Sequence, residues 1–222
     1  MVDNSTDQPE DRMPLLDHLI ELRTRLIWSV LTFLVAFLFC FYFADQLFNF
    51  LVEPLKDIFE GEEGRRLIFT ALHEKFFTNI KVAFFASAML AFPVIAVQVW
   101  MFVAPGLYKN EKGAFLPYLF VTPILFLIGS SMVYYIVMPV AWQFFASFQT
   151  MGTVDIENEL PIELLPRVSE YLSLSMRLIF AFGFAFQLPV AITLLARAGL
   201  ATSEGLKDKR RYAIVLAFVA AA

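Results

Sequence analysis

Long apolar stretches separated by short polar segments dominate the chain. A helix needs about 20 mainly apolar residues to cross a bilayer. Four runs reach that length, and they cover residues 26–48, 76–103, 114–148 and 171–196. The third run is too long for one straight crossing, and Pro117, Pro123 and Pro139 predict a kinked or tilted helix there. The pattern therefore predicts an all-α fold, a polytopic helical membrane protein with a single transmembrane domain.

A fifth apolar run covers residues 212–222, the last eleven of the sequence. Eleven helical residues rise only about 16 Å, against a hydrocarbon core of roughly 30 Å. This span is expected to be incomplete as written. The prediction for the chain is four complete transmembrane helices plus a truncated fifth.

The first span is preceded by a polar tail and an amphipathic segment. Residues 1–13 are polar and acidic, and residues 14–25 follow with leucines at helical spacing on one side. Asp17, Glu21 and Arg25 fall on the other side of that helix. This arrangement predicts a helix over 14–25 that lies in the membrane interface.

Composition agrees with the pattern. Hydrophobic residues make up 59% of the chain, charged residues 17%, and the mean hydropathy is +0.67. Soluble domains are nearer half apolar and a quarter charged, so lipid is the natural solvent for this chain. The net charge of −4 argues against nucleic-acid binding, which needs a basic surface.

No motif supports an enzyme. The sequence has no phosphate-binding loop, nucleophile elbow or HExxH. His18 and His73 fall on opposite sides of the predicted membrane, so they are not expected to share a metal, and no cofactor is implied.

Basic residues near the span ends predict the orientation. One side collects ten of them and the other seven. The richer side, taken as cytoplasmic, holds the N-terminus and contains Arg12, Arg23, Arg25, Lys109, Lys112, Arg197, Lys207, Lys209, Arg210 and Arg211.

Two carboxylates on that side are candidates for binding. Glu21 is either a simple i,i+4 partner of Arg25 or a carboxylate presented at the membrane surface. Glu111, between Lys109 and Lys112, is by itself a loop charge. Taken together, the two carboxylates could each bind an arginine side chain in bidentate fashion, a geometry that lysine does not reproduce.

Gln187 is a polar residue deep in the fourth span, next to Pro189. Polar residues at this depth are functional candidates, but they also form ordinary hydrogen bonds between helices. Both interpretations are open from the sequence.

Three segments carry a family resemblance: HLIELRTRL, FPVIAVQVWMFVAPGLYKNEK and YLSLSMRLIFAFGFAFQLPVAITLLARAGL. They resemble TatC, the membrane receptor subunit of the twin-arginine protein translocase. The resemblance implies six transmembrane helices, both termini in the cytoplasm, and binding of the twin-arginine signal peptides of folded cargo. It also implies that Glu21 and Glu111 recognise the signal peptide. Further motif positions of the family are Arg23, Pro54, Pro93, Phe102 and Lys109.

The same resemblance implies the location of the protein, its partners and its energy source. Proteins of this family reside in the bacterial cytoplasmic (inner) membrane, act with the single-span proteins TatA and TatB, and use the protonmotive force. A homo-oligomer within a larger complex is expected. Many members carry a glutamate where this sequence has Gln187, so a role that requires ionisation is not expected here.

The leading hypothesis is a receptor for twin-arginine signal peptides. An alternative is a small-molecule or ion transporter of the inner membrane, which would need ionisable groups within the spans. A third is a scaffold that only gathers partner helices.

Overall fold

The computed structural model describes residues 15–58, 67–107, 116–148 and 165–197, and these are almost entirely helical. The helices are α1 (Leu15–Tyr42), α2 (Ala44–Lys56), α3 (Glu74–Leu107), α4 (Leu116–Met132), α5 (Met138–Ala146), α6 (Val168–Ala185) and α7 (Leu188–Arg197). A π-helical turn, Val133–Val137, joins α4 to α5. The predicted tail at 1–13, the loop residues Lys109 and Glu111, and the fifth run at 212–222 lie outside the described residues.

Within the described residues, four helical segments are long and apolar enough to cross a membrane, as the sequence predicts. They are Leu16–Tyr42, Glu74–Phe102, Pro117–Ala146 and Val168–Leu194. In the most apolar part of the first span only 11% of the residues are buried inside the molecule. Large apolar side chains such as Leu34, Val35 and Leu38 are exposed on it. A helix surface covered with such side chains is suited to contact with lipid rather than with water.

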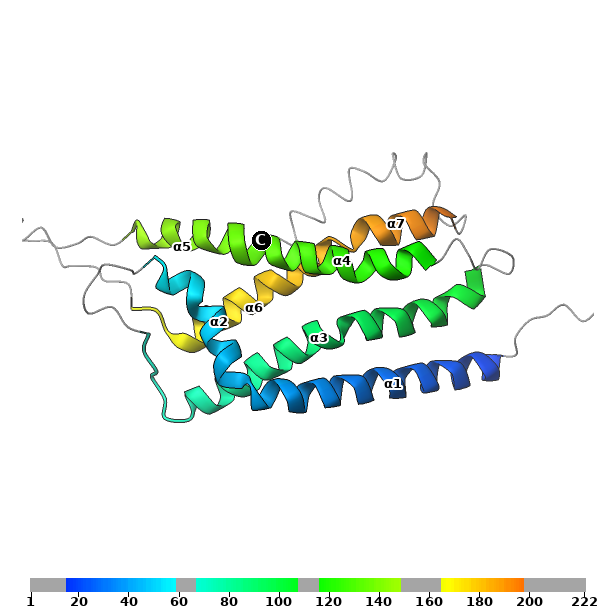
Figure 1. Cartoon of the computed structure of the whole chain (residues 1–222), viewed down its shortest axis with the longest axis horizontal. Coiled ribbons are helices and arrows are strands. Elements are labelled where there is room, and N and C mark those ends of the chain that lie inside the picture. Colours follow the sequence, from blue (N-terminus) through cyan, green and yellow to red (C-terminus); the bar gives the residue numbers. More distant parts are fainter. Residues whose placement is uncertain (1–14, 59–66, 108–115, 149–164, 198–222) are drawn as a thin grey trace, which may run out of the picture.

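The segments alternate in direction (Figure 1). α1 and α3 lie side by side, α4 and α5 run above them, and α6 and α7 pack alongside α4. We call the end where α1 begins and α3 finishes the N-terminal end of the bundle. α2 crosses the opposite end, which we call the α2 end.

The first span differs from the prediction at both of its boundaries. The helix predicted over 14–25 is continuous with the span, since α1 runs unbroken from Leu15 to Tyr42. The predicted end at residue 48 is wrong, because α1 stops at Tyr42 and α2 begins at Ala44. α2 then continues to Lys56.

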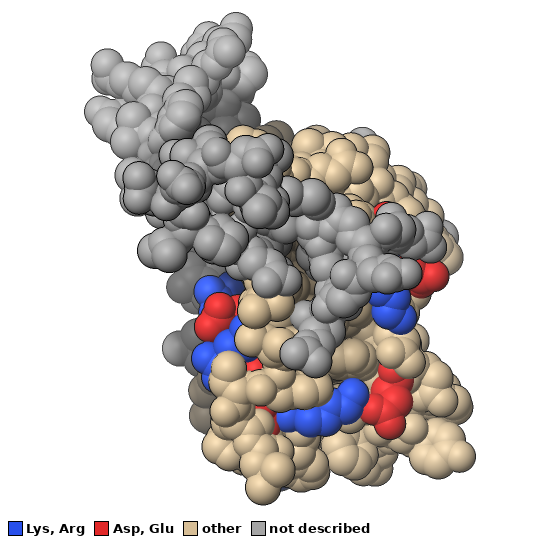
Figure 2. Space-filling view, turned by 90° about the vertical axis from the view of Figure 1, so that its left-hand side faces the viewer, with Lys and Arg blue, Asp and Glu red and all other residues tan. Residues whose placement is uncertain are grey.

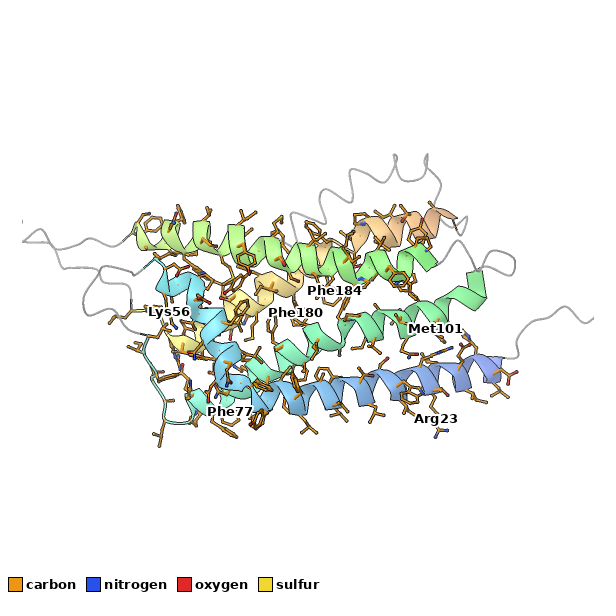
Figure 3. All side chains as sticks on the ribbon, in the orientation of Figure 1. Arg23, Lys56, Phe77, Met101, Phe180 and Phe184 are labelled. Carbon is orange, nitrogen blue, oxygen red and sulfur yellow. The ribbon has the colours of Figure 1, made fainter. Side chains whose placement is uncertain are left out.

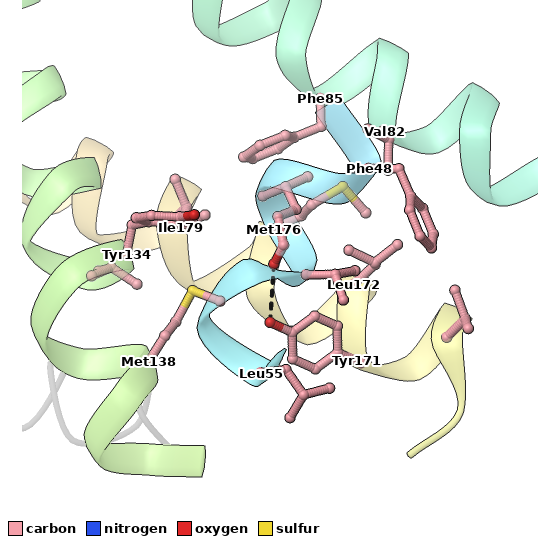
Figure 4. Packing of buried hydrophobic residues seen from close by; sticks show 14 of the residues in the cluster. Phe48, Leu55, Val82, Phe85, Tyr134, Met138, Tyr171, Leu172, Met176 and Ile179 are labelled. Atoms are coloured by element: carbon pink, nitrogen blue, oxygen red, sulfur yellow. Dashed lines mark hydrogen bonds between the residues drawn. The ribbon is translucent and has the colours of Figure 1, made fainter. Parts of the chain in front are cut away.

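The reason is that α2 buries its apolar face against protein rather than lipid. Phe48, Leu51, Val52 and Leu55 are all buried in a hydrophobic core cluster with residues of α3, α5 and α6 (Figure 4). An apolar run therefore continues past residue 42 although the membrane helix has ended.

The third span follows one path with an irregular middle. Pro139 has no N–H to donate to the carbonyl of Tyr135, one turn back. The π-helical turn Val133–Val137 comes directly before it, and there the N–H of Met138 donates to Val133 five residues back. The widened turn thus accommodates the proline without ending the helix.

Two tyrosines satisfy carbonyls beside Pro54, inside α2. Proline removes the N–H that would bond the carbonyl of Phe50. The hydroxyl of Tyr134 donates to that oxygen at 2.7 Å. The hydroxyl of Tyr171, from α6, donates to the neighbouring carbonyl of Leu51 at 3.0 Å (Figure 4). α2 is therefore bonded to two spans, through the carbonyl that Pro54 leaves without its helical partner and through the carbonyl next to it.

α4 and α6 approach closely at two glycines. A Cβ on Gly183 would come within 2.7 Å of the Phe126 ring and 2.8 Å of the Ser130 hydroxyl. A Cβ on Gly129 would come within 2.8 Å of the carbonyl oxygen of Phe182. Small residues at these points let the two backbones meet, as is common between membrane helices.

Charged residues of both signs gather at the α2 end (Figure 2). Glu74, only 6% exposed, accepts hydrogen bonds from the backbone N–H groups of Thr70, Ala71 and Ser169. It also pairs with Arg167, whose Nε lies 3.2 Å from Oε1, and this contact raises the pKa of the Arg167 guanidinium. The first turns of α3 and α6 are thereby fixed to each other.

We expect Tyr134→Phe to lower the free energy of unfolding by about 1 kcal/mol, because it removes the hydrogen bond to the Phe50 carbonyl. In a Pro54→Ala background the same change should cost less, since an alanine at this position has a backbone N–H to offer that carbonyl. Reversible unfolding in mixed detergent gives the four values of this double-mutant cycle. Equal costs in both backgrounds would refute the assigned role of Tyr134.

We expect Gly183→Ala to destabilise the bundle by about 1–3 kcal/mol, the usual cost of overpacking. Phe126 is 1% exposed and its ring stacks on Phe92, with centroids 3.8 Å apart. Ala181→Val is the matched control, because it adds methyl groups on the exposed side of α6. Thermal unfolding in detergent measures both, and a Gly183→Ala protein as stable as wild type would contradict the close contact.

Candidate functional site

Glu21 and Arg25 lie one turn apart on α1 at the N-terminal end of the bundle. Arg25 Nη2 donates to Glu21 Oε1 at 3.2 Å, and the two side chains are about one-quarter exposed, 22% for Glu21 and 27% for Arg25. This confirms the i,i+4 pair, one of the two interpretations of Glu21. Pairs of this kind contribute only a few tenths of a kcal/mol to a helix, so the pair has little weight in stability.

Arg25 also reaches across to α3. Its Nη1 donates to Gln98 Oε1 at 3.3 Å and lies 3.7 Å from the sulfur of Met101. The guanidinium therefore connects the carboxylate of Glu21 on α1 to the last turns of α3. Sequence reasoning missed Gln98, although an amide inside an apolar span, near the same membrane face as Arg25, was an available signal.

A second contact joins the two helices at this end. The ring of His18 stacks on Phe102, with centroids 4.3 Å apart and planes 19° from parallel. Phe102, a motif position of the sequence analysis, thus packs directly on α1. Together the two contacts fix the helical turn that carries Glu21 against the end of α3.

The remaining predicted positions lie apart from Glu21 or outside the described residues. Arg23 is exposed and extends from the side of α1 that faces away from α3 (Figure 3). Pro54 belongs to α2, at the other end. Pro93 lies within α3, and Lys109 and Glu111 are outside the described residues.

Pro93 lines an apolar cavity of about 550 Å³ between the layers, together with residues such as Phe43, Leu90 and Leu127. This volume is within the usual range for ligand pockets, about 300–1,000 Å³. The hydroxyl of Ser130, a side chain only 5% exposed, lines the cavity and has no hydrogen-bond partner within the described structure.

Gln187 lies where the fourth span is interrupted, between the end of α6 at Ala185 and the start of α7 at Leu188. Its Nε2 donates to the carbonyl of Thr122 on α4 at 2.9 Å. The Thr122 hydroxyl in turn accepts from the Trp100 indole at 3.2 Å. The structure thus places Gln187 in a hydrogen bond between helices, one of the two interpretations left open.

Metal binding finds no support in the described part of the chain, where no three His, Cys, Asp or Glu residues gather. His73 packs edge-on against Phe77, with centroids 5.7 Å apart.

Fold and site together define a polytopic α-helical membrane protein with a polar, carboxylate-bearing site at one end of two paired spans. The family model of the Sec-independent protein translocase protein TatC matches residues 17–222. The TatC protein of Magnetococcus marinus is 51% identical over 213 residues, which cover 96% of this chain and 74% of that protein. The TatC protein of Escherichia coli K12 is 40% identical over 210 residues, covering 95% and 77%.

A solved structure of a TatC protein has the same fold as this chain. The crystal structure of the twin-arginine translocase receptor TatC in the detergent DDM superposes with a TM-score of 0.77. It is 37% identical to this chain, and the match covers 91% of this chain and 85% of that one. The chain belongs to the TatC family of Sec-independent protein translocase proteins.

We expect Gln187→Leu to lower the free energy of unfolding by only about 0.6 kcal/mol, the average contribution of a hydrogen bond between membrane helices. Binding of a twin-arginine signal peptide, the ligand that the family resemblance implies, should be retained. Unfolding in mixed detergent and a binding assay on the same preparation measure both quantities. Lost binding at nearly unchanged stability would instead favour the functional interpretation of Gln187.

Proposed function

We propose that this chain is the receptor component of a twin-arginine translocation system. It binds the twin-arginine signal peptides of folded proteins for export across the cytoplasmic membrane. In this proposal Glu21 and Glu111 each bind one arginine of the pair. Membership of the TatC family supports the system, and the arrangement around Glu21 supports the site.

The observation that carries the proposal is the attachment of Glu21 to the end of α3. Arg25 and His18 hold this turn of α1 against Gln98 and Phe102. Glu111 follows the end of α3 at Leu107 by four residues, which span at most about 14 Å. Chain connectivity therefore limits how far Glu111 can lie from Leu107, the last residue of the helix that Arg25 and His18 contact.

Two carboxylates in this setting suit a pair of guanidinium groups. Each can accept two parallel N–H bonds from one arginine, and bonds of this type are roughly twice as strong as neutral ones. A partly exposed site at the end of the spans is reachable by a peptide from the aqueous side. A carboxylate there also pays a smaller desolvation cost than a fully buried one would.

The same proposal covers the orientation of the chain, its location, its partners and its energy source. The excess of basic residues on the side of the N-terminus supports a cytoplasmic N-terminus, in the bacterial inner membrane. We propose TatA-like and TatB-like single-span proteins as partners, a homo-oligomer within a larger complex, and the protonmotive force as energy source. No contact among the described residues favours the transporter alternative.

We expect Glu21→Gln and Glu111→Gln each to weaken binding of a twin-arginine signal peptide by about tenfold or more. Each change replaces a charge-assisted hydrogen bond, worth on the order of 1.5–3 kcal/mol, by a neutral one. Titration of a fluorescent peptide into detergent-solubilised protein gives the affinities. Binding should also weaken as salt rises, because the site is partly exposed.

Glu170→Gln is the matched control, because that carboxylate is exposed on α6 at the α2 end and pairs only peripherally with Arg167. It should bind the peptide as wild type does. The proposal fails if the Glu21 and Glu111 variants keep wild-type affinity, or if Glu170→Gln weakens binding as much as they do.

A further inference from the structure

Two charged side chains lie inside the spans, away from the sites described above. Beyond their first turns, α3 carries one charged residue, Lys81, and α6 carries one, Arg177. Both are exposed, and neither makes an ion pair or a hydrogen bond with another residue in the described part of the chain. Because a charge within a span is costly, an ionisable residue there is a functional candidate that needs a partner.

The two cations lie at similar depths in neighbouring helices. Lys81 follows the start of α3 by seven residues, and Arg177 follows the start of α6 by nine. At 1.5 Å per residue these positions are about 10 and 14 Å along the helices. α3 and α6 begin side by side at the α2 end, since the carboxylate of Glu74 accepts a hydrogen bond from the N–H of Ser169.

An aromatic contact places both cations on the same side of the seam between α3 and α6. The rings of Phe85 and Phe180 meet edge to face, with centroids 5.0 Å apart. Lys81 precedes Phe85 by four residues and Arg177 precedes Phe180 by three, and residues at these spacings share a helix face. Packed helices lie about 8–10 Å apart, so the two long side chains can converge on one anion between them.

The surroundings of the two cations favour a lipid over a soluble anion. Phe84 follows Lys81 by three residues and is 57% exposed, and Phe184 follows Arg177 by seven residues and is 54% exposed. These rings lie further along the spans than the cations, where lipid acyl chains are the solvent. A phospholipid brings a phosphate for the cations and acyl chains for the exposed rings.

One alternative is that each side chain extends by itself to the membrane surface. A protein partner is the other alternative. The carboxylate of Glu170 lies on α6 seven residues before Arg177, but it is paired with Arg167 at 3.4 Å. A shared anion differs from both alternatives, because it makes the two cations depend on each other.

We propose that Lys81 and Arg177 together form a binding site for an anionic phospholipid. Its phosphate lies between the two cations, and its acyl chains lie along the exposed phenylalanines. Charge complementarity carries the inference, because two positive charges without partners in the described structure face the apolar side of the spans. The site is in the half of the bundle nearer the α2 end, and it does not rest on the recognition of signal peptides.

The test measures lipid binding to the full chain in detergent by native mass spectrometry. Phosphatidylglycerol and phosphatidylcholine with the same acyl chains are titrated separately. Wild type should bind one phosphatidylglycerol molecule about tenfold more tightly than phosphatidylcholine, because two cations near the membrane surface favour the lipid of net negative charge. Inorganic phosphate should not displace the lipid.

Substitutions at the two exposed positions separate a shared site from two independent cations. Lys81→Gln and Arg177→Gln should each reduce the preference for phosphatidylglycerol to about threefold or less, and the double variant should abolish it. Arg177→Lys keeps the charge and should keep most of the preference. Lys56→Gln is the matched control, because it removes an equal charge from an exposed residue of α2 at the same end of the bundle. It should bind both lipids as wild type does.

The inference is overturned if wild type does not prefer phosphatidylglycerol, or if either glutamine variant keeps the wild-type preference. It is also overturned if Lys56→Gln lowers the preference as much as they do, since the effect would then be one of net charge. Two phosphatidylglycerol molecules, each lost with one of the two residues, would show separate cations rather than one site. Displacement by inorganic phosphate would show a site for free anions rather than for a lipid.

Discussion

The structure depends on one constraint, that backbone polar groups within lipid must find partners inside the protein. Regular helix satisfies most of them. Two irregular points have a specific remedy: the π-helical turn before Pro139, and the Tyr134 hydroxyl on the carbonyl that Pro54 frees. These two irregular points are joined to each other, because Tyr134 lies in the π-helical turn and bonds the carbonyl of Phe50 in α2.

Polar chemistry is accordingly concentrated at the two ends, where it serves different purposes. At the α2 end the carboxylate of Glu74 is buried and accepts hydrogen bonds from two separate segments. It therefore holds the first turns of α3 and α6 together. At the N-terminal end the carboxylate of Glu21 is partly exposed and held by one bond from Arg25. A saturated carboxylate suits a structural joint, whereas an incompletely satisfied one remains available to a ligand.

The sequence predicts the four spans well, because their length and hydrophobicity are set by the bilayer. It also predicts the pairing of Glu21 with Arg25, which needs only helical spacing. The end of the first span could not be found, since the apolar residues of α2 look the same whether they face lipid or protein. Gln98 and the Glu74–Arg167 pair were missed because their partners are distant in sequence, with 73 residues separating Gln98 from Arg25 and 93 separating Glu74 from Arg167.

The tyrosine ties to α2 have a consequence for biogenesis. The carbonyls of Phe50 and Leu51 are synthesised early, but the hydroxyls that satisfy them come 84 and 120 residues later. Until the third and fourth spans have inserted, α2 must rest where water or lipid headgroups supply substitute donors. Its docking is therefore a late event in assembly, and the cavity that it helps to line is completed only when Ile179 of the fourth span arrives.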